Sequence, residues 1–167
     1  MTEANIKMVR IDERLIHGQG QLWINSLGAN LVIVANDEVS KSPIQQTLMK
    51  SLINKNIGVR FFDIEETCEK IPKASPKQTI FVIVKNPKDL VRLAEGGIVV
   101  KEVNVGNIHF ADGKKQLTNY ISIGEEDLIA LRDLKDNYGV RFNTRTTPIG
   151  GDAGVVLDLN GYLEKNK

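Results

Sequence analysis

The sequence predicts an α/β fold: an open, mostly parallel sheet with helices on both faces, formed as a single domain over residues 1–167. Short segments rich in valine and isoleucine alternate with longer amphipathic segments, which is the pattern of successive β-α-β units. The length is that of one ordinary domain, and a chain of this size buries roughly 70% of its unfolded surface. We therefore expect it to fold without disulfides or a structural metal.

Several short segments are predicted as strands. The first, at residues 6–11, is apolar and ends abruptly in charged residues. The segments at 30–36 and 79–85 are almost entirely apolar and β-branched, as strands covered on both faces are. The remaining predicted strands lie at 58–64, 103–106, 117–123 and 139–145.

Five segments are predicted as helices. In the clearest, at 124–139, leucines recur every third residue and three acidic residues occupy the first turn. The helix at 42–53 has a proline in its first turn and repeats apolar residues every fourth position, at Ile44, Leu48 and Leu52, which is typical of one helix face. The other three are predicted at 19–27, 65–71 and 87–95.

The composition excludes several classes of protein. Lys and Arg total 22 against 21 Asp and Glu, so no strong field favours a nucleic-acid partner. The sequence contains neither a membrane-spanning apolar stretch nor the apolar run of a signal peptide, and we expect a cytoplasmic location. The single cysteine, Cys68, excludes an internal disulfide and is expected to be a partly buried small residue.

Common cofactor motifs are incomplete. Residues 18–20 read GQG but lack the third glycine of a dinucleotide fingerprint, and the stretch 106–114 is too long for a phosphate-binding loop. The segment GGDAG at 150–154 has no strand before it and no helix after it. The two histidines lie far apart without the spacing of zinc ligands. We expect neither a cofactor nor a metal.

The segment RIDERLIHGQGQLW, at 10–23, holds the candidate reactive residue. In open α/β sheets, functional groups gather beyond the carboxyl ends of the strands. His17 lies on the loop that follows the first predicted strand. Because neutral imidazole is a good nucleophile near neutral pH, this histidine could accept a phosphoryl group.

Such a histidine needs three kinds of support, and the sequence offers candidates for each. A cation must stabilise the phosphoryl charge, and Arg14 or Arg10 can supply it. Backbone N–H groups before the next helix can bind the oxygens, with Gly18 allowing close approach. A carboxylate should hold the other ring nitrogen and fix the tautomer, with Asp12 as the first candidate and Asp37 as the second.

Each of these residues also has a simpler interpretation. His17 could be a solvated or capping loop residue, Arg14 a surface charge, and Asp12 a cap of the following turn. His109 is expected to pack or hydrogen-bond locally. Trp23 is expected in the core or in a subunit interface, and an interface would make the protein a homodimer.

One resemblance adds to this reading. RIDERLIHGQ, at 10–19, closely resembles the active-site segment of the enzyme IIB subunit of the mannose/fructose/sorbose family of the bacterial sugar phosphotransferase system. IVANDEV at 33–39, QQTLMK at 45–50 and NVGNIH at 104–109 are similar in the same order. The resemblance extends to about residue 148, so no role is transferred to the tail.

The resemblance implies a phosphocarrier. His17 would be phosphorylated on its δ nitrogen by enzyme IIA, and would pass the group to a sugar entering through the membrane components IIC and IID, with which the subunit would associate peripherally. Arg14 falls where the family places a phosphate-contacting arginine, Asp12 where it places a supporting acid, and Gln19 beside the phosphate. HGQGQLW, with Gly20 in place of the common valine or isoleucine, is more similar to subunits for N-acetylgalactosamine or galactosamine.

Two other functions compete with this one. The first is a non-catalytic α/β module that binds an anionic small ligand at the same loop, with His17 as a hydrogen-bond donor. The second is a small hydrolase with His17 as its base, which the absence of a G-x-S-x-G elbow disfavours.

Overall fold

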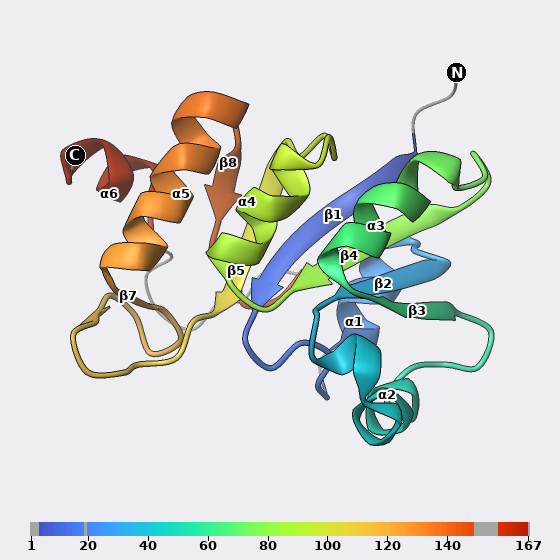
Figure 1. Ribbon diagram of the computed structural model, residues 1–167. Coiled ribbons are helices and arrows are strands. Elements are labelled where there is room, and N and C mark those ends of the chain that lie inside the picture. The colour runs from blue at the N-terminus through green and yellow to red at the C-terminus, as the bar shows by residue number, and fades with distance from the viewer. Residues whose placement is uncertain (1–3, 19, 149–156, 167) are drawn as a thin grey trace.

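The computed structural model describes residues 4–18, 20–148 and 157–166. Its main feature is a sheet of six parallel strands in the order β3-β2-β4-β1-β5-β8 (Figure 1). The strands are β1 (Asn5–Asp12), β2 (Leu31–Ala35), β3 (Gly58–Phe62), β4 (Thr79–Val84), β5 (Glu102–Asn107) and β8 (Arg141–Asn143). The predicted open, parallel α/β sheet is confirmed.

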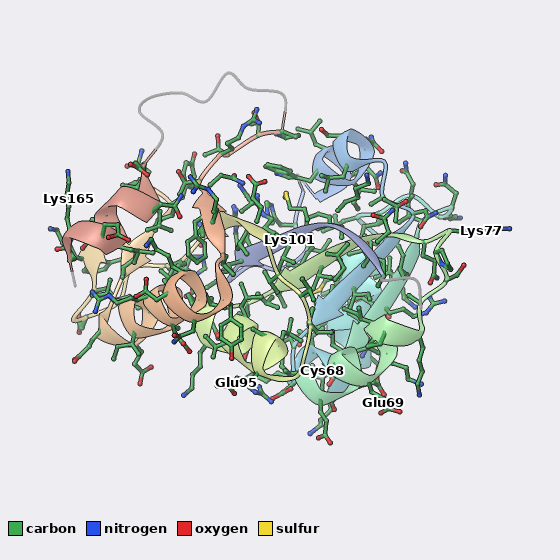
Figure 2. The ribbon with its side chains drawn as sticks, turned by 90° about the horizontal axis from the view of Figure 1, so that it is seen from above. Cys68, Glu69, Lys77, Glu95, Lys101 and Lys165 are labelled. Atoms are coloured by element: carbon green, nitrogen blue, oxygen red, sulfur yellow. The ribbon has the colours of Figure 1, made fainter. Side chains whose placement is uncertain are left out.

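Helices cover both faces of this sheet, as predicted. The helices are α1 (Gly20–Leu27), α2 (Pro43–Lys50), α3 (Ile64–Lys70), α4 (Pro87–Glu95), α5 (Glu125–Tyr138) and α6 (Leu159–Lys165), with short 3-10 turns at η1 (Val39–Lys41) and η2 (Ile71–Lys73). Figures 1 and 2 show α3, α4 and α5 on one face and α1 on the other. None of the helices in the described ranges is long and apolar enough to cross a membrane.

Two apolar clusters fill the space between the sheet and its helices. Because successive side chains of a strand point to opposite faces, Val9 and Ile11 of β1 pack in the larger cluster, with leucines from α4 and α5. On the opposite face, Trp23 and Ile24 of α1 pack on alternate residues of β2 and β4. Each such fully buried apolar side chain stabilises the fold by about 1.5–3 kcal/mol relative to an exposed one.

The chain crosses the sheet in opposite directions from the two strands β1 and β4. From β1 it passes through α1 on one face to reach β2. From β4 it passes through α4 on the other face to reach β5. The carboxyl end of β1, which lies between β4 and β5, is therefore a switch point of the kind where open α/β sheets bind their ligands.

The strand predicted at 117–123 is wrong for most of its length and does not join the main sheet. Only β6 (Lys115–Gln116) and β7 (Ser122–Ile123) form there, as a separate antiparallel ribbon. Between them, Oγ1 of Thr118 accepts hydrogen bonds from the backbone N–H groups of Tyr120 (3.1 Å) and Ile121 (3.0 Å). A threonine that satisfies the backbone in this way favours a turn over an extended strand.

The helix predicted at 42–53 is shorter than expected, and its apolar face points outward. It begins at Pro43 and ends at Lys50. Ile44, Leu48 and Leu52 have exposed fractions of 76%, 63% and 45%. This apolar stripe therefore faces solvent. In Figure 1, α2 and the loop that follows β1 both lie below the sheet.

Cys68 is partly buried, as the sequence analysis expected. It lies in α3, on the face of the sheet opposite α1 (Figure 2). Its Sγ lies 3.9 Å from the carbonyl oxygen of Leu93 in α4. Burial raises the pKa of the thiol, so Cys68 is a poor nucleophile near neutral pH.

Candidate functional site

The loop that carries His17 is fixed by a backbone hydrogen bond at its start and by two buried side chains just before the histidine. The backbone N–H of Glu13 donates to the carbonyl of Asn107 at the end of β5 (3.0 Å). Leu15 and Ile16 are buried in the cluster beneath α1. Leu15 has a positive φ of 57°, a left-handed conformation that a bulky residue rarely adopts and that its buried side chain maintains here. The following histidine is therefore held at a defined place rather than on a mobile loop.

Asp12, the last residue of β1, is the centre of the site. Its carboxylate is fully buried and accepts five hydrogen bonds. Oδ1 accepts from the backbone N–H of Arg14 (2.9 Å) and from its Nε (3.0 Å). Oδ2 accepts from Nη2 of Arg14 (3.0 Å) and Nη2 of Arg10 (3.1 Å), and lies 3.1 Å from Nε2 of His17. One carboxylate thus joins both candidate arginines to the candidate nucleophile.

The ionisation of Asp12 determines the tautomer of His17. Burial raises the pKa of the Asp12 carboxyl, but the bonds from His17 and Arg14 and the charge of Arg10 together lower it well below its usual range. An ionised carboxylate can only accept, so the ring nitrogen that faces it, Nε2, carries the hydrogen. Nδ1 makes no hydrogen bond to any described residue and keeps its lone pair.

The two arginines occupy different environments. The Arg14 side chain is 36% exposed and binds Asp12 through one edge of its guanidinium. Arg10 is buried, with Nη1 on Oδ1 of Asn104 and its guanidinium carbon 5.1 Å from the centre of the Trp23 ring. Burial lowers the pKa of Arg10, and Asp12 opposes that shift. Of the two, only Arg14 presents donors at the surface, where an anion could reach them.

The other predicted site residues are Gly18, Gln19 and Asp37. Gly18 is exposed, and a Cβ built on it would meet nothing within 4 Å, so the space beside it is open. Gln19 lies outside the described residues. Asp37 accepts from the backbone N–H of Ile64 (3.0 Å) and from Arg92 (2.9 Å). The structure therefore brings Asp12, and not Asp37, to the histidine.

Comparison with known proteins then places the chain. Residues 6–165 match the family described as the sorbose subfamily IIB component of the PTS system. The chain belongs to this family. It is 47% identical over 137 residues to the N-acetylgalactosamine-specific phosphotransferase enzyme IIB component 1 of Escherichia coli, covering 81% of this chain and 87% of that protein. It is 34% identical over 166 residues to the fructose-specific EIIB component of Bacillus subtilis, covering 96% and 99%.

A solved structure is similar along almost the whole chain. The crystal structure of a PTS-dependent N-acetyl-galactosamine-IIB component from Streptococcus pyogenes superposes with a TM-score of 0.91 and 51% sequence identity. The match covers 97% of this chain and 99% of that one. The resemblance found in the sequence is confirmed at the level of the family and of the fold.

One buried residue at the candidate site of this IIB component was not predicted from the sequence. Asn104 is fully buried in β5 and bonds to Arg10. The signal was present, because an asparagine between Val103 and Val105 interrupts an otherwise apolar strand. Buried amides are normally hydrogen-bonded, so such a residue predicts a polar partner inside the fold.

The second histidine and the single tryptophan have local roles. Nδ1 of His109 lies 2.8 Å from Oε2 of Glu13, so this histidine pairs within the loop region, as expected. Trp23 is 5% exposed and belongs to the core of this chain. In the part of the chain that the structure describes, no group of three or more His, Cys, Asp or Glu side chains could hold a metal ion.

Proposed function

We propose that this IIB component carries a phosphoryl group on Nδ1 of His17, received from a phosphohistidine of enzyme IIA and passed to a sugar that enters through IIC and IID. The observation that carries the proposal is the contact between Nε2 of His17 and the buried carboxylate of Asp12. It leaves Nδ1 as the nucleophile, on a side chain that is 20% exposed.

The chemistry of the first step follows from this arrangement. The lone pair of Nδ1 attacks the phosphorus, and the bond between phosphorus and the donor nitrogen breaks, with its electron pair returning to the donor imidazole. Because Nε2 keeps its hydrogen, the His17 ring gains positive charge as the new bond forms. Asp12 lies against that nitrogen and stabilises the charge, as the carboxylate of a catalytic triad stabilises its imidazolium.

Arg14 supplies the charge that the phosphoryl group needs. A transferring phosphoryl group spreads negative charge over three oxygens, so catalysis depends on positioning and on compensating charge. The Arg14 guanidinium has five N–H donors, and only part of them bind Asp12. The remaining donors, with the open space beside Gly18, form the side on which we place the phosphoryl oxygens.

The surface around the loop is suited to partners that dock and leave. Exposed apolar side chains that such partners could contact are Ile44 and Leu48 of α2 and Phe110, which precedes the β6–β7 ribbon. A carrier must meet enzyme IIA and the membrane components in turn, so each association should be weak and brief. We place the protein in the cytoplasm, associated peripherally with the permease.

N-acetylgalactosamine is the proposed final acceptor, with galactosamine as the alternative. The support is that two similar proteins, from Escherichia coli and Streptococcus pyogenes, are named as N-acetylgalactosamine components. The segment HGQGQLW points to the same pair of sugars. Transfer to the sugar would form a phosphorus–oxygen bond as the attacking hydroxyl releases its proton to solvent, and would return the electron pair of the phosphorus–nitrogen bond to Nδ1 of His17.

The proposal is tested by labelling this chain with radioactive phosphoenolpyruvate, the general phosphotransfer proteins and a cognate enzyme IIA. We expect the wild type and His109→Ala to take an acid-labile, base-stable label and His17→Ala to take none. Membranes that contain IIC and IID should then discharge the label onto N-acetylgalactosamine or galactosamine but not onto fructose or sorbose. A label retained by folded His17→Ala would overturn the carrier assignment, and discharge onto fructose would overturn only the sugar.

A further inference from the structure

A row of three polar residues crosses the sheet at the level of the site. Arg10 of β1 is in register with Asn104 of β5, and Asn104 is in register with Asn143 of β8. Residues in register on adjacent parallel strands point to the same face, so these three side chains lie side by side. The row leads from the edge strand of the sheet to the arginine that binds Asp12.

The hydrogen bonds of Asn104 admit only one orientation of its amide. Oδ1 accepts from Nη1 of Arg10. Nδ2 donates to Oδ1 of Asn143 (2.6 Å) and to the carbonyl oxygen of Arg145 (3.0 Å). A flipped amide would turn its NH2 toward the guanidinium donors and its oxygen toward two acceptors. Asn143, the next residue of the row after Asn104, is oriented in turn because its Nδ2 donates to Oε1 of Glu102 (3.1 Å).

The guanidinium of Arg10 is held in place by its surroundings. Nη2 binds Asp12, Nη1 binds Asn104, and Cζ lies over the Trp23 ring, 5.1 Å from its centre. A Cβ added to Gly106 would lie 2.7 Å from Nε of Arg10 and closer still to Cζ and Nη2, so this glycine leaves the space that the guanidinium fills. The bond to Asn104 gives the guanidinium a second hydrogen-bonded anchor besides Asp12, so it cannot pivot about the bond to Asp12 alone.

We propose that Asn104 is a positioning residue of the phosphoryl-transfer site, which acts by fixing Arg10 so that Arg10 and Asp12 hold His17 in the tautomer with hydrogen on Nε2. The inference rests on the proposed function for its effect on transfer. Its effect on the ring of the unphosphorylated protein is independent of that function. Asn143 is the outer support of the same row, at the end of an edge strand.

The test measures the ring nitrogens of His17 directly. In protein with ¹⁵N-labelled histidine, the nitrogen shifts show which nitrogen carries the hydrogen at a pH where the ring is neutral. We expect a single Nε2–H tautomer in the wild type and a mixture of tautomers in Asn104→Leu, which keeps the number of side-chain heavy atoms and the branch point but removes the hydrogen bonds. By analogy with other residues that orient a reactive histidine, transfer from saturating enzyme IIA should slow roughly 10-fold or more, with the half-saturating concentration unchanged.

Two further variants keep the test decisive. Thr67→Val removes the hydrogen bond of another fully buried polar side chain, from Oγ1 of Thr67 to the carbonyl of Asp63 (2.7 Å), on α3 away from the site. It should lose stability without changing the tautomer or the rate. Asn143→Ala, on the edge strand, removes only the outer support and should give a partial shift.

A wild-type tautomer and rate in folded Asn104→Leu would overturn the proposal. If that variant does not fold, an unchanged tautomer in Asn143→Ala would overturn it instead. If the tautomers change as expected but no variant, nor the wild type, accepts phosphate, the proposed function fails while the positioning role of Asn104 holds.

Discussion

Nε2 of His17 lies 3.1 Å from Oδ2 of Asp12, on a carboxylate that is fully buried and bound by two arginines. This contact links the end of the first strand to the loop that carries His17. It determines which ring nitrogen is free, and it makes the state of the histidine depend on the ionisation of the aspartate.

Asp12→Asn should slow phosphoryl transfer to His17 by roughly 100-fold or more, because a neutral amide neither fixes the tautomer nor stabilises the charge on the ring. The matched control is Asp37→Asn, since Asp37 also accepts from an arginine but binds Arg92 instead of the site. The control should stay within about threefold of the wild type. Single-turnover transfer from enzyme IIA measures both, and equal slowing of the two variants would show that Asp12 has no special role.

Asp12 should also make the free energy of unfolding depend on pH in the acid range. A carboxyl group whose folded pKa lies below its unfolded value of about 3.9 stabilises the fold fully above that value and loses this contribution as the pH falls below it. At neutral pH, Asp12→Asn should cost about 3 kcal/mol or more of unfolding free energy, because Arg10 is left buried and unpaired. Urea denaturation should show the gap between variant and wild type narrowing from about pH 5 to about pH 3. A gap that is the same at all pH values would contradict this account of Asp12.

Arg14→Lys should be poorly tolerated. Arginine presents a planar fork, and in this structure one edge of the fork already binds both oxygens of Asp12. Lysine cannot bind the carboxylate and a phosphoryl group in this way at once. The loss of one preorganised donor costs about 2–4 kcal/mol in the transition state, or a rate loss of roughly 30- to 1000-fold. Rapid-quench kinetics would show it, and a slowing of less than about threefold would mean that Arg14 is only a surface charge.

The outward stripe of α2 should matter for docking and not for chemistry. Leu48→Glu places a charge on an exposed apolar residue of α2, and it should raise the half-saturating concentration of enzyme IIA roughly tenfold, equivalent to about 1.4 kcal/mol. The rate at saturation should be unchanged. Ile129→Glu on α5 is the matched control, because Ile129 is 60% exposed, close to the 63% of Leu48, but belongs to another face. Identical kinetics for the two variants would remove α2 from the docking surface.

The buried parts of the fold could be predicted from the sequence because the inner strands of a parallel sheet are covered on both faces. Such strands appear in the sequence as continuous apolar segments. The strands β2 and β4 lie within the apolar segments that predicted them. The predictions failed where a side chain satisfied the backbone or where an apolar pattern faced outward. Thr118 turns the chain where a strand was predicted, and the stripe on α2 has the spacing of a core face yet lies exposed. The spacing of apolar residues predicts that a helix has an apolar face, but it does not predict whether another element or solvent covers that face.

The pairing of Asp12 with His17 could also be predicted from the sequence, but the role of Asn104 could not. Asp12 and His17 lie on one short segment, so the carboxylate and the ring could be paired by proximity alone. Asn104 lies 94 residues after Arg10, and only the register of β1 with β5 brings the two together. Asp37 follows a strand at the same edge of the sheet, but the strand order puts β4 between β2 and β1. A strand order cannot be read from local pattern, which is why Asp37 remained a candidate.

The most direct test of the account is to identify the phosphorylated atom. Protein with ¹⁵N-labelled histidine, in the wild type and in His109→Ala, would be phosphorylated by enzyme IIA and studied by ³¹P and ¹⁵N magnetic resonance. We predict that phosphorus couples to Nδ1 of His17 and that its Nε2 keeps a hydrogen, bonded to Asp12, in both proteins. Phosphorus coupled to Nε2 of His17, or a phosphoryl group on His109 in the wild type, would contradict it.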